Sequence, residues 1–266
     1  MSNTLLRIGF IEIKWYSFFI FVAIIVSSFL IIKEATKKDI KKDELIDMLF
    51  YGIIIGILGA RLYYVIFNLK YYLTYPFEII EVWNGGLAIH GGIIATFIFL
   101  FIYCKKKKMN FLLILDILVV GVIIAQSIGR WGNFFNGEAY GRIVSLSFLE
   151  GLHLPKFIID RMCIGGLYRE PTFLYESVLS LIGFIILIIV RTIKKLRVGV
   201  LTGIYFLWYG IERFIIETFR SDSLMLGSIK VAQLISIIFC IIGIYMIFKN
   251  IKSNKLYKEA TIFLKD

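Results

Sequence analysis

Seven long apolar segments are the strongest constraint on how this chain can fold. Each is close to the roughly 20 residues that a helix needs to cross a bilayer. Hydrophobic residues make up 59% of the 266 positions and charged residues 18%, against about 25% charged in soluble domains. The sequence predicts an all-α, polytopic integral membrane protein whose seven spans lie at residues 15–32, 48–69, 87–104, 111–129, 172–190, 199–219 and 231–248.

We expect a single seven-span membrane domain at 1–248, which would also contain any catalytic site, followed by a basic cytosolic tail at 249–266. The chain contains 3 prolines, and neither a proline-rich linker nor an internal repeat marks a second soluble domain. A lysine cluster follows the first apolar segment where a cleaved signal peptide would have a small-residue site, so we expect an uncleaved first helix.

Lysine and arginine are distributed unevenly between the loops, which predicts the topology. Cytoplasmic loops carry the excess of positive charge in membrane proteins, which places the N-terminus outside and the C-terminus in the cytosol. A small extracytoplasmic loop domain then falls between spans four and five. The net charge of +11 follows from this topology, with attraction to anionic lipid headgroups as a second effect. We therefore expect no nucleic-acid partner. Of the 30 cations, 18 lie in 33–45, 105–110, 191–198 and the tail from 249.

Two cations, Arg61 and Arg213, lie inside predicted spans. A charge at membrane depth is costly and usually functional, although a structural ion pair would also explain it. The predicted topology brings most polar residues of the spans to one depth near the outer leaflet. We therefore infer a polar cavity open to the outer face, with Arg130 and Asn133 at its mouth and contributions from Tyr16, Arg61, His90, Gln126, Glu176, Arg213, Glu217 and Gln233.

A polar stripe runs along the sixth predicted span. Tyr209, Arg213 and Glu217 are spaced by four residues and therefore share one helix face, with Arg220 a turn further on. Either Arg213 and Glu217 form a self-sufficient ion pair, or Glu217 holds Arg213 while the remaining guanidinium donors bind a phosphate, whose oxygens match that planar group. Spacing alone leaves both open.

His90 lies between two glycine pairs, at 85–86 and 91–92. It could be a satisfied core residue, or a base that takes a proton from a thiol or hydroxyl near neutral pH. His153, in the outer loop, is expected at the surface. The three cysteines are widely spaced, which argues against a metal site or disulfides and favours small apolar residues in helices.

Residues 129–141 read GRWGNFFNGEAYG, a glycine-rich polar run between the fourth and fifth spans. This run resembles the signature of the bacterial prolipoprotein diacylglyceryl transferases, GRxGNFxNxExxG, at every fixed position. Other segments are similar to that family as well. They are Lys14-Trp15-Tyr16, WNGGLAIHGG at 83–92 with Asn84 for the usual aspartate, PTFLYE at 171–176, and YGIERFIIETFRSD at 209–222 with Ser221 for the usual proline.

The resemblance implies a transferase of the bacterial plasma membrane whose active site faces the outer leaflet. Such an enzyme moves the diacylglyceryl group of phosphatidylglycerol to the thiol of the lipobox cysteine of a prolipoprotein. A thioether forms, glycerol phosphate leaves, and no metal or organic cofactor is implied. A transporter or lipid carrier, or another headgroup enzyme with a non-protein acceptor, is the competing interpretation. A transporter predicts inverted repeats and polar groups through the full depth.

The resemblance also implies roles for individual residues. Two arginines would clamp the lipid phosphate while two carboxylates orient them, and His90 would assist deprotonation of the thiol. Neighbouring groups would hydrogen-bond the headgroup or allow close approach of the lipid. The implied residues are Arg130 and Arg213 as the clamp, Glu138 and Glu217 as the orienting carboxylates, His90 as the base, Tyr16 and Asn133 as hydrogen-bonding groups, Gly141 as the turn, and Tyr209 as a further functional position.

Overall fold

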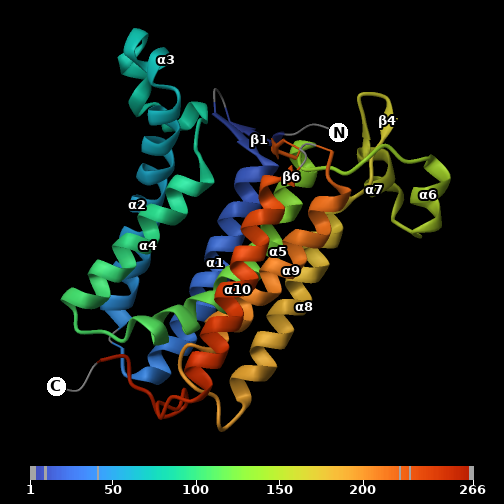
Figure 1. The fold of residues 1–266 in the computed structure, drawn as a ribbon. Helices are drawn as coiled ribbons and strands as arrows, with labels where there is room; N and C mark the ends of the chain where they lie inside the picture. The colour runs from blue at the N-terminus through green and yellow to red at the C-terminus, as the bar shows by residue number, and fades with distance from the viewer. Residues whose placement is uncertain (1–3, 9–10, 41, 222, 228, 264–266) are drawn as a thin grey trace. The chain divides into compact units, whose positions relative to one another are not determined.

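The computed structural model describes residues 4–8, 11–40, 42–221, 223–227 and 229–263. Every predicted span is a helix (Figure 1), and six of these helices are long and apolar enough to cross a membrane. The seventh, α9, also carries the charged residues Glu212, Arg213 and Glu217. The long helices are α1 (Trp15–Ala35), α2 (Lys42–Phe67), α4 (Ile89–Lys106), α5 (Phe111–Asn136), α8 (Thr172–Thr192), α9 (Val200–Phe219) and α10 (Val231–Ile251).

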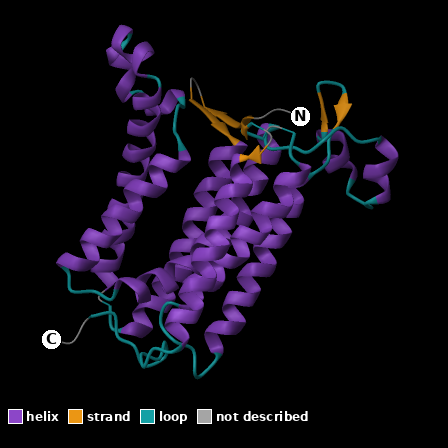
Figure 2. Ribbon diagram, in the orientation of Figure 1, coloured by secondary structure: helices purple, strands orange, loops and turns teal. Residues whose placement is uncertain are grey.

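Short elements connect the long helices, including three two-stranded antiparallel hairpins that the all-α prediction did not contain (Figure 2). The first hairpin directly precedes α1 and pairs Leu6 with Ile13 and Arg7 with Glu12. The short elements are β1 (Thr4–Ile8), β2 (Ile11–Lys14), η1 (Thr36–Lys38), α3 (Leu69–Thr74), η2 (Pro76–Ile80), η3 (Val82–Asn84), α6 (Leu146–Gly151), α7 (Lys156–Arg161), β3 (Cys163–Ile164), β4 (Leu167–Tyr168), β5 (Met225–Leu226) and β6 (Ile229–Lys230).

The chain forms two compact units, and both contain membrane helices. Unit 1 comprises residues 1–31 and 115–260, and unit 2 comprises residues 32–114 and 261–266. The single catalytic domain at 1–248 stays a prediction.

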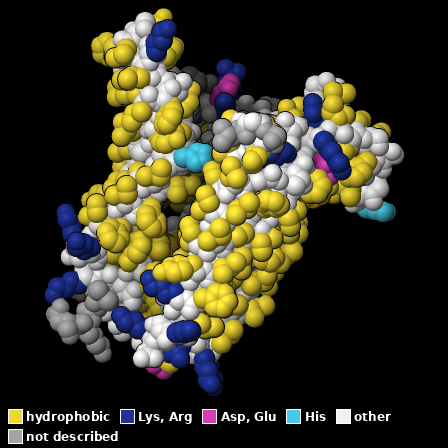
Figure 3. All heavy atoms as spheres, viewed as in Figure 1, with side chains coloured by type: hydrophobic (Ala, Val, Ile, Leu, Met, Phe, Trp, Pro, Cys, Tyr) yellow, Lys and Arg dark blue, Asp and Glu magenta, His cyan; other side chains and the backbone are white. Residues whose placement is uncertain are grey.

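Helix α5 is the central helix of unit 1. Half of its apolar window is buried, compared with 11% for α1 and α10. Its buried side chains include Ile117, Val120 and Ile123. The other long helices expose apolar side chains along their flanks, while Lys and Arg gather towards the helix ends (Figure 3). Because α5 is surrounded by protein, polar side chains near its end can be buried among neighbouring helices rather than in lipid.

Asp116, near the beginning of α5, is a fully buried carboxylate that is satisfied by hydrogen bonds from another helix. Its oxygens accept hydrogen bonds from the backbone N–H groups of Gly199 (2.5 Å) and Thr202 (2.8 Å) and from the Thr202 hydroxyl (2.6 Å). These donors belong to the first turn of α9, where backbone N–H groups otherwise have no partner. Asp116 therefore caps α9 from a neighbouring helix and fixes the start of the helix that carries Arg213.

We expect Asp116→Ala to lower the free energy of unfolding by about 3 kcal/mol or more, because it leaves buried donors without an acceptor at about 1–3 kcal/mol each. Thermal unfolding in detergent micelles measures the loss. Asp160→Ala, which removes an exposed aspartate of α7, is the control and should leave the midpoint unchanged. An Asp116→Ala protein as stable as the wild type would contradict the capping role.

The predicted topology places the cation-rich segments 33–45, 105–110, 191–198 and the tail from 249 on the cytosolic side. Within each unit, backbone hydrogen bonds join these segments at the same end of the helices. In unit 1 the backbone N–H of Tyr257 donates to the carbonyl of Leu196 (2.8 Å). In unit 2 the N–H of Ile262 donates to the Lys38 carbonyl (3.1 Å), and its own carbonyl accepts from Asn110 (2.6 Å). The tail is packed rather than loose, since Tyr257 and Ile262 are buried.

The predicted loop domain between spans four and five is a small folded subdomain of unit 1. It contains α6, α7 and the β3–β4 hairpin, and its apolar core also includes the ends of α5 and α8. Arg161 donates to the carbonyls of Phe134 and Phe135 at the end of α5, and desolvation there lowers the pKa of Arg161. The subdomain thus stabilises the end of α5. Its core residues are Phe134, Leu149, Ile158, Met162 and Phe173.

Candidate functional site

A cluster of arginines and carboxylates joins α5, α8 and α9 in unit 1. Each carboxylate oxygen of Glu176 pairs with a different arginine: Oε2 lies 2.7 Å from Arg130 Nε, and Oε1 lies 2.9 Å from Arg213 Nη1. The side chain of Glu176 is only 1% exposed. A buried carboxylate needs such partners because isolated charge is costly away from water. Glu176 therefore fixes two arginines from two other helices beside each other.

Arg213 has a second carboxylate partner on its own helix. Its Nη2 atom lies 2.7 Å from Glu217 Oε2, one turn further along α9, which confirms that Glu217 holds Arg213. Arg220 approaches from the end of the same helix, with Nη1 3.9 Å from Glu176 Oε1. Arg213 therefore belongs to an ion-pair network that spans three helices rather than to a pair with Glu217 alone, and its binding of a phosphate stays a prediction.

Both arginines remain accessible enough to bind an anion. Their side chains are 21% (Arg130) and 20% (Arg213) exposed, while Glu176 and Glu217 are almost fully buried. Arg130 approaches Glu176 through Nε, and no hydrogen bond from its terminal amino groups is found in the described part of the chain. The carboxylates thus hold the cations from inside, and free guanidinium donors remain for phosphate oxygens.

Glu176 is the residue at this site to which the sequence analysis assigned no role. Its position at the end of PTFLYE and at the inferred depth of the arginines were the available signals. The role of orienting Arg130 was given to Glu138 instead. In the structure Glu138 is exposed and accepts a hydrogen bond from Asn136 Nδ2 (2.7 Å), so the ion pair of Arg130 is formed with Glu176.

The signature is mostly helical, which corrects its interpretation as a run between spans. Helix α5 continues to Asn136, and positive φ angles first occur at Gly137 (70°) and Ala139 (55°). Gly132 serves packing, because a Cβ there would lie 3.1 Å from Tyr16 Cδ2 and 3.5 Å from Tyr16 Cα. The missing side chain therefore lets the start of α1 approach α5.

This close approach brings Tyr16 to the arginine cluster. Arg130 and Glu138 are both within electrostatic range of its hydroxyl. Asn133 lies one turn beyond Arg130 on α5, half-buried. The structure thus places Tyr16, Arg130 and Asn133 at the same end of unit 1, as the sequence predicted.

Gly141, the last residue of the signature, packs against the backbone and side chains of residues 170–172. Its N–H donates to the Glu170 carbonyl (2.9 Å), and it forms a β-bridge with Arg220. A Cβ at Gly141 would lie 2.8 Å from Glu170 Cβ and 2.9 Å from Thr172 Cγ2. The glycine therefore permits close backbone packing beside α9. Ser221, which replaces the usual proline, also donates weakly to the Gly141 carbonyl (3.3 Å), while Asp222 lies outside the described residues.

Tyr209 completes the stripe on α9. Its ring stacks on that of Tyr205, with centroids 6.0 Å apart, and it lies within electrostatic range of Arg130, Arg213 and Glu176. The predicted face of Tyr209, Arg213 and Glu217 therefore points towards α5 and α8.

His90 and Arg61 belong to unit 2, which is described by itself. His90 is exposed in the first turn of α4, with its ring centroid 6.4 Å from that of Tyr63. The adjacent glycines permit close helix packing, because a Cβ at Gly92 would lie 3.1 Å from the Gly56 carbonyl oxygen of α2. The role of His90 as a base stays a prediction.

Arg61 has a structural role within unit 2. Its guanidinium donates to the backbone carbonyls of Ile79 (2.9 Å) and Gly85 (2.8 Å) and also to that of Glu78, and it lies 5.2 Å from the Tyr72 ring centroid. These bonds hold the loop that leads into α4. They support the structural explanation of this buried charge rather than a catalytic one.

The second histidine and the cysteine of the predicted loop domain both lie at the surface. His153 is exposed, as expected, whereas Cys163 is exposed on β3 and is not an apolar residue of a helix. Among the described residues, no group of three or more His, Cys, Asp or Glu is arranged to hold a metal ion.

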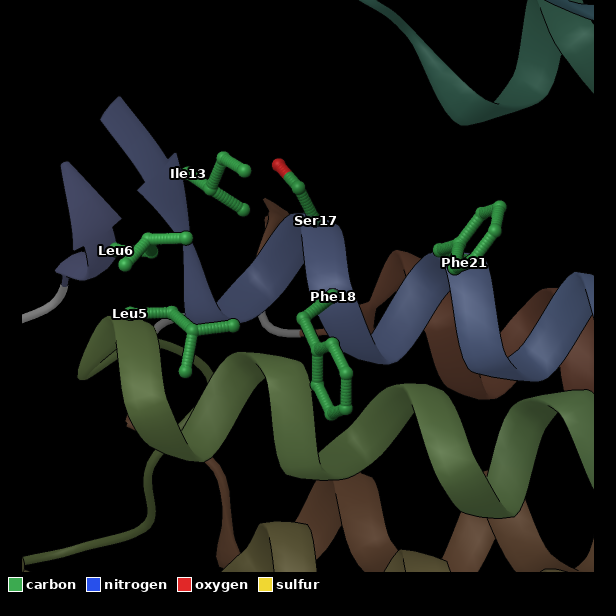
Figure 4. Close-up of a pocket in the computed structure, with 6 residues that line it drawn as sticks. All are labelled: Leu5, Leu6, Ile13, Ser17, Phe18 and Phe21. Atoms are coloured by element: carbon green, nitrogen blue, oxygen red, sulfur yellow. The ribbon is translucent and has the colours of Figure 1, made fainter. Parts of the chain in front are cut away.

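An apolar pocket of about 530 Å³ lies between the first hairpin and the start of α1 (Figure 4). Ser17 is the only lining residue with a polar side chain, so the pocket suits apolar groups. The lining residues are Leu5, Leu6, Ile13, Ser17, Phe18 and Phe21.

Known proteins resemble the chain over nearly its full length. A family model described as prolipoprotein diacylglyceryl transferase matches residues 3–249. The phosphatidylglycerol–prolipoprotein diacylglyceryl transferase of Staphylococcus haemolyticus is 49% identical over 263 residues, covering 98% of this chain and 93% of the relative. The protein of the same name from Staphylococcus aureus strain MSSA476 is 48% identical over 257 residues, covering 96% and 91%.

Proposed function

The chain belongs to the prolipoprotein diacylglyceryl transferase family, and from this premise we propose how its buried arginines and carboxylates act. The enzyme transfers the diacylglyceryl group of phosphatidylglycerol to a prolipoprotein cysteine. The cysteine sulfur forms a bond to the glycerol carbon that carries the phosphate. The carbon–oxygen bond breaks with its electron pair on the departing glycerol phosphate, and the thiol loses its proton.

We infer that Arg130 and Arg213 bind the lipid phosphate and stabilise the negative charge that grows on it as the bond breaks. Groups fixed before the reaction are effective at this because they need no reorganisation. Glu176 and Glu217 hold both guanidinium groups in place. Asn133 and Tyr16 are proposed to hydrogen-bond the headgroup, Tyr209 to support the arginines, and Gly141 to fix the loop beside them.

The proposed topology follows from the same site. We propose α9 as the seventh span, since its charged face contacts α5 and α8 while Ile211, Phe214 and Ile215 are exposed. The positive-inside rule then places the N-terminus and the arginine cluster on the outer side of the bacterial plasma membrane. A translocated signal peptide would present its lipobox cysteine at that level.

The observation that carries the proposal is the ion-pair network Arg130–Glu176–Arg213, with two partly exposed cations over a buried carboxylate. The test uses purified protein, phosphatidylglycerol and a lipobox peptide, and detects thioether-linked product by mass. Product is expected with the cysteine peptide and not with its cysteine-to-serine variant. Equal product with both peptides would contradict transfer to the thiol. Lipid that is bound and released without any product would contradict the proposal and favour a carrier.

His90→Ala is expected to slow transfer by about 10²-fold or more, the usual contribution of a general base, while saturation with phosphatidylglycerol persists. The reason is that an unperturbed thiol, with a pKa near 8.5, is mostly protonated at neutral pH. His153→Ala is the matched control, because this histidine is exposed in the outer loop. If His90→Ala transfers at nearly the wild-type rate, His90 is structural.

A further inference from the structure

A second polar layer lies one helical turn deeper than the arginine cluster. Gln126 is four residues before Arg130 on α5, and Ser180 is four residues after Glu176 on α8. Both therefore lie on the faces that carry the cluster. Gln126 Nε2 donates to the Tyr205 hydroxyl (3.0 Å), and Ser180 Oγ donates to Glu212 Oε1 (2.8 Å). The layer thus contains a third acidic side chain, Glu212, which the mechanism above does not use.

Glu212 differs from the two carboxylates that hold the arginines. It is 5% exposed. The Oε2 atoms of all three carboxylates are buried without a hydrogen-bond donor among the described residues, but those of Glu176 and Glu217 each lie 2.7 Å from an arginine nitrogen, and no ion pair of Glu212 is found there. Glu176 and Glu217 are ion-paired at 2.7–2.9 Å. Among the described residues the Ser180 hydroxyl is the only hydrogen-bond partner of Glu212, although Arg130, Arg213 and Glu176 are within electrostatic range. It is therefore the least neutralised carboxylate of the site.

The charges of the site nearly balance before any lipid binds. Arg130, Arg213 and Arg220 face Glu176, Glu217 and Glu212. Two further charged groups of opposite sign lie at the edge of this cluster. Lys230 donates a hydrogen bond to the Arg220 carbonyl (3.2 Å), and Glu138 is exposed. Tyr205 and Tyr209 are the other titratable groups near Glu212, and neither α1 between residues 15 and 32 nor α10 between 231 and 248 contains a charged residue.

A phosphodiester that binds to Arg130 and Arg213 adds one negative charge to this nearly neutral, largely buried group. An additional negative charge nearby favours the protonated form of a buried carboxylic acid. The carboxylate that gains the proton is the one with the weakest partners, because protonating Glu176 or Glu217 would break a direct ion pair. Protonation of Glu212 would therefore return the net charge of the cluster to nearly zero after the phosphodiester binds.

We propose that Glu212 takes up a proton from solution when the anionic headgroup of phosphatidylglycerol binds, and so acts as a positioning residue that sets the charge of the arginine site. The proposal rests on the proposed lipid-phosphate site. In this step Glu212 Oε2 gains an O–H bond and a hydronium ion of the solution loses one, while no covalent bond of the lipid changes. Lipid binding then becomes weaker as the pH rises, because binding requires a proton.

The experiment mixes the purified full-length protein with phosphatidylglycerol micelles in weakly buffered solution containing a pH indicator, without peptide. The wild type is expected to take up as much as about one proton per bound lipid at pH values above the midpoint of Glu212 in the lipid-free protein, and its apparent Kd should rise by up to about tenfold per pH unit in the same range. Glu212→Gln should bind lipid with no uptake and a flat pH profile. Glu150→Gln, an exposed residue of α6, should behave as the wild type.

Ser180→Ala keeps Glu212 and removes its one donor, so its uptake should move to higher pH. This variant keeps the test decisive if Glu212→Gln does not fold. Saturable lipid binding without proton uptake in the wild type, or equal uptake in Glu212→Gln, overturns the inference and leaves the lipid site intact. Absence of saturable binding to the wild type would instead contradict the proposed function.

Discussion

Arg213→Lys is expected to lower the rate of diacylglyceryl transfer by about 10²–10³-fold, the usual effect of removing one fixed donor from a site of developing charge. Lysine keeps the charge but cannot reproduce the geometry of Arg213, whose two terminal nitrogens reach Glu176 and Glu217 at 2.9 and 2.7 Å. An ammonium ion is a compact point charge, so it could not span both carboxylates and still offer a phosphate the same fork.

The measurement is the initial rate of thioether formation at several phosphatidylglycerol concentrations. The loss should fall mainly on kcat, because the interaction strengthens as the leaving phosphate gains charge. Arg130→Lys should show the same loss. Arg7→Lys is the control, since Arg7 is exposed on the first hairpin and forms only a surface pair with Glu12 at 3.5 Å. If the Arg213→Lys variant turns over at the wild-type rate, the clamp is wrong.

Glu176→Gln is expected to have the largest combined effect on stability and activity. It leaves Arg130 and Arg213 without their shared counter-charge in a buried position, and breaking a buried pair costs about 3–5 kcal/mol. The thermal midpoint in detergent should fall, and transfer should be lost even at temperatures where the variant remains folded. Helical content by circular dichroism distinguishes folded protein without activity from unfolded protein.

A conservative variant and a control variant test whether the effect is due to the charge of Glu176. Glu176→Asp keeps the charge on a shorter side chain and should recover part of the stability. Glu138→Gln changes an exposed carboxylate that accepts a hydrogen bond from Asn136, so the thermal midpoint should not change. Equal destabilisation by Glu138→Gln and Glu176→Gln would mean that the network does not depend on Glu176 in particular.

The sequence predicted the membrane helices because each must satisfy its own backbone hydrogen bonds in lipid, which makes length and apolarity sufficient signals. The same residues predicted the shared face of Tyr209, Arg213 and Glu217, since helical periodicity fixes which side chains align. Arg61 shows the limit of that reasoning. A buried cation looks functional from depth alone, but carbonyls of a loop more than 15 positions away along the chain are its partners.

The sequence by itself determined the class of protein, the family resemblance and several of the residues that gather at one end of unit 1, among them Tyr16, Arg130 and Arg213. Only the tertiary structure decided which carboxylate meets which arginine. The signature suggested Glu138 for Arg130, yet α5 continues as a helix to Asn136 and leaves Glu138 exposed, while α8 brings Glu176 between both arginines. Pairing between helices depends on how they pack against each other, and that information is spread over contacts such as Gly132 against Tyr16 rather than carried by any one motif.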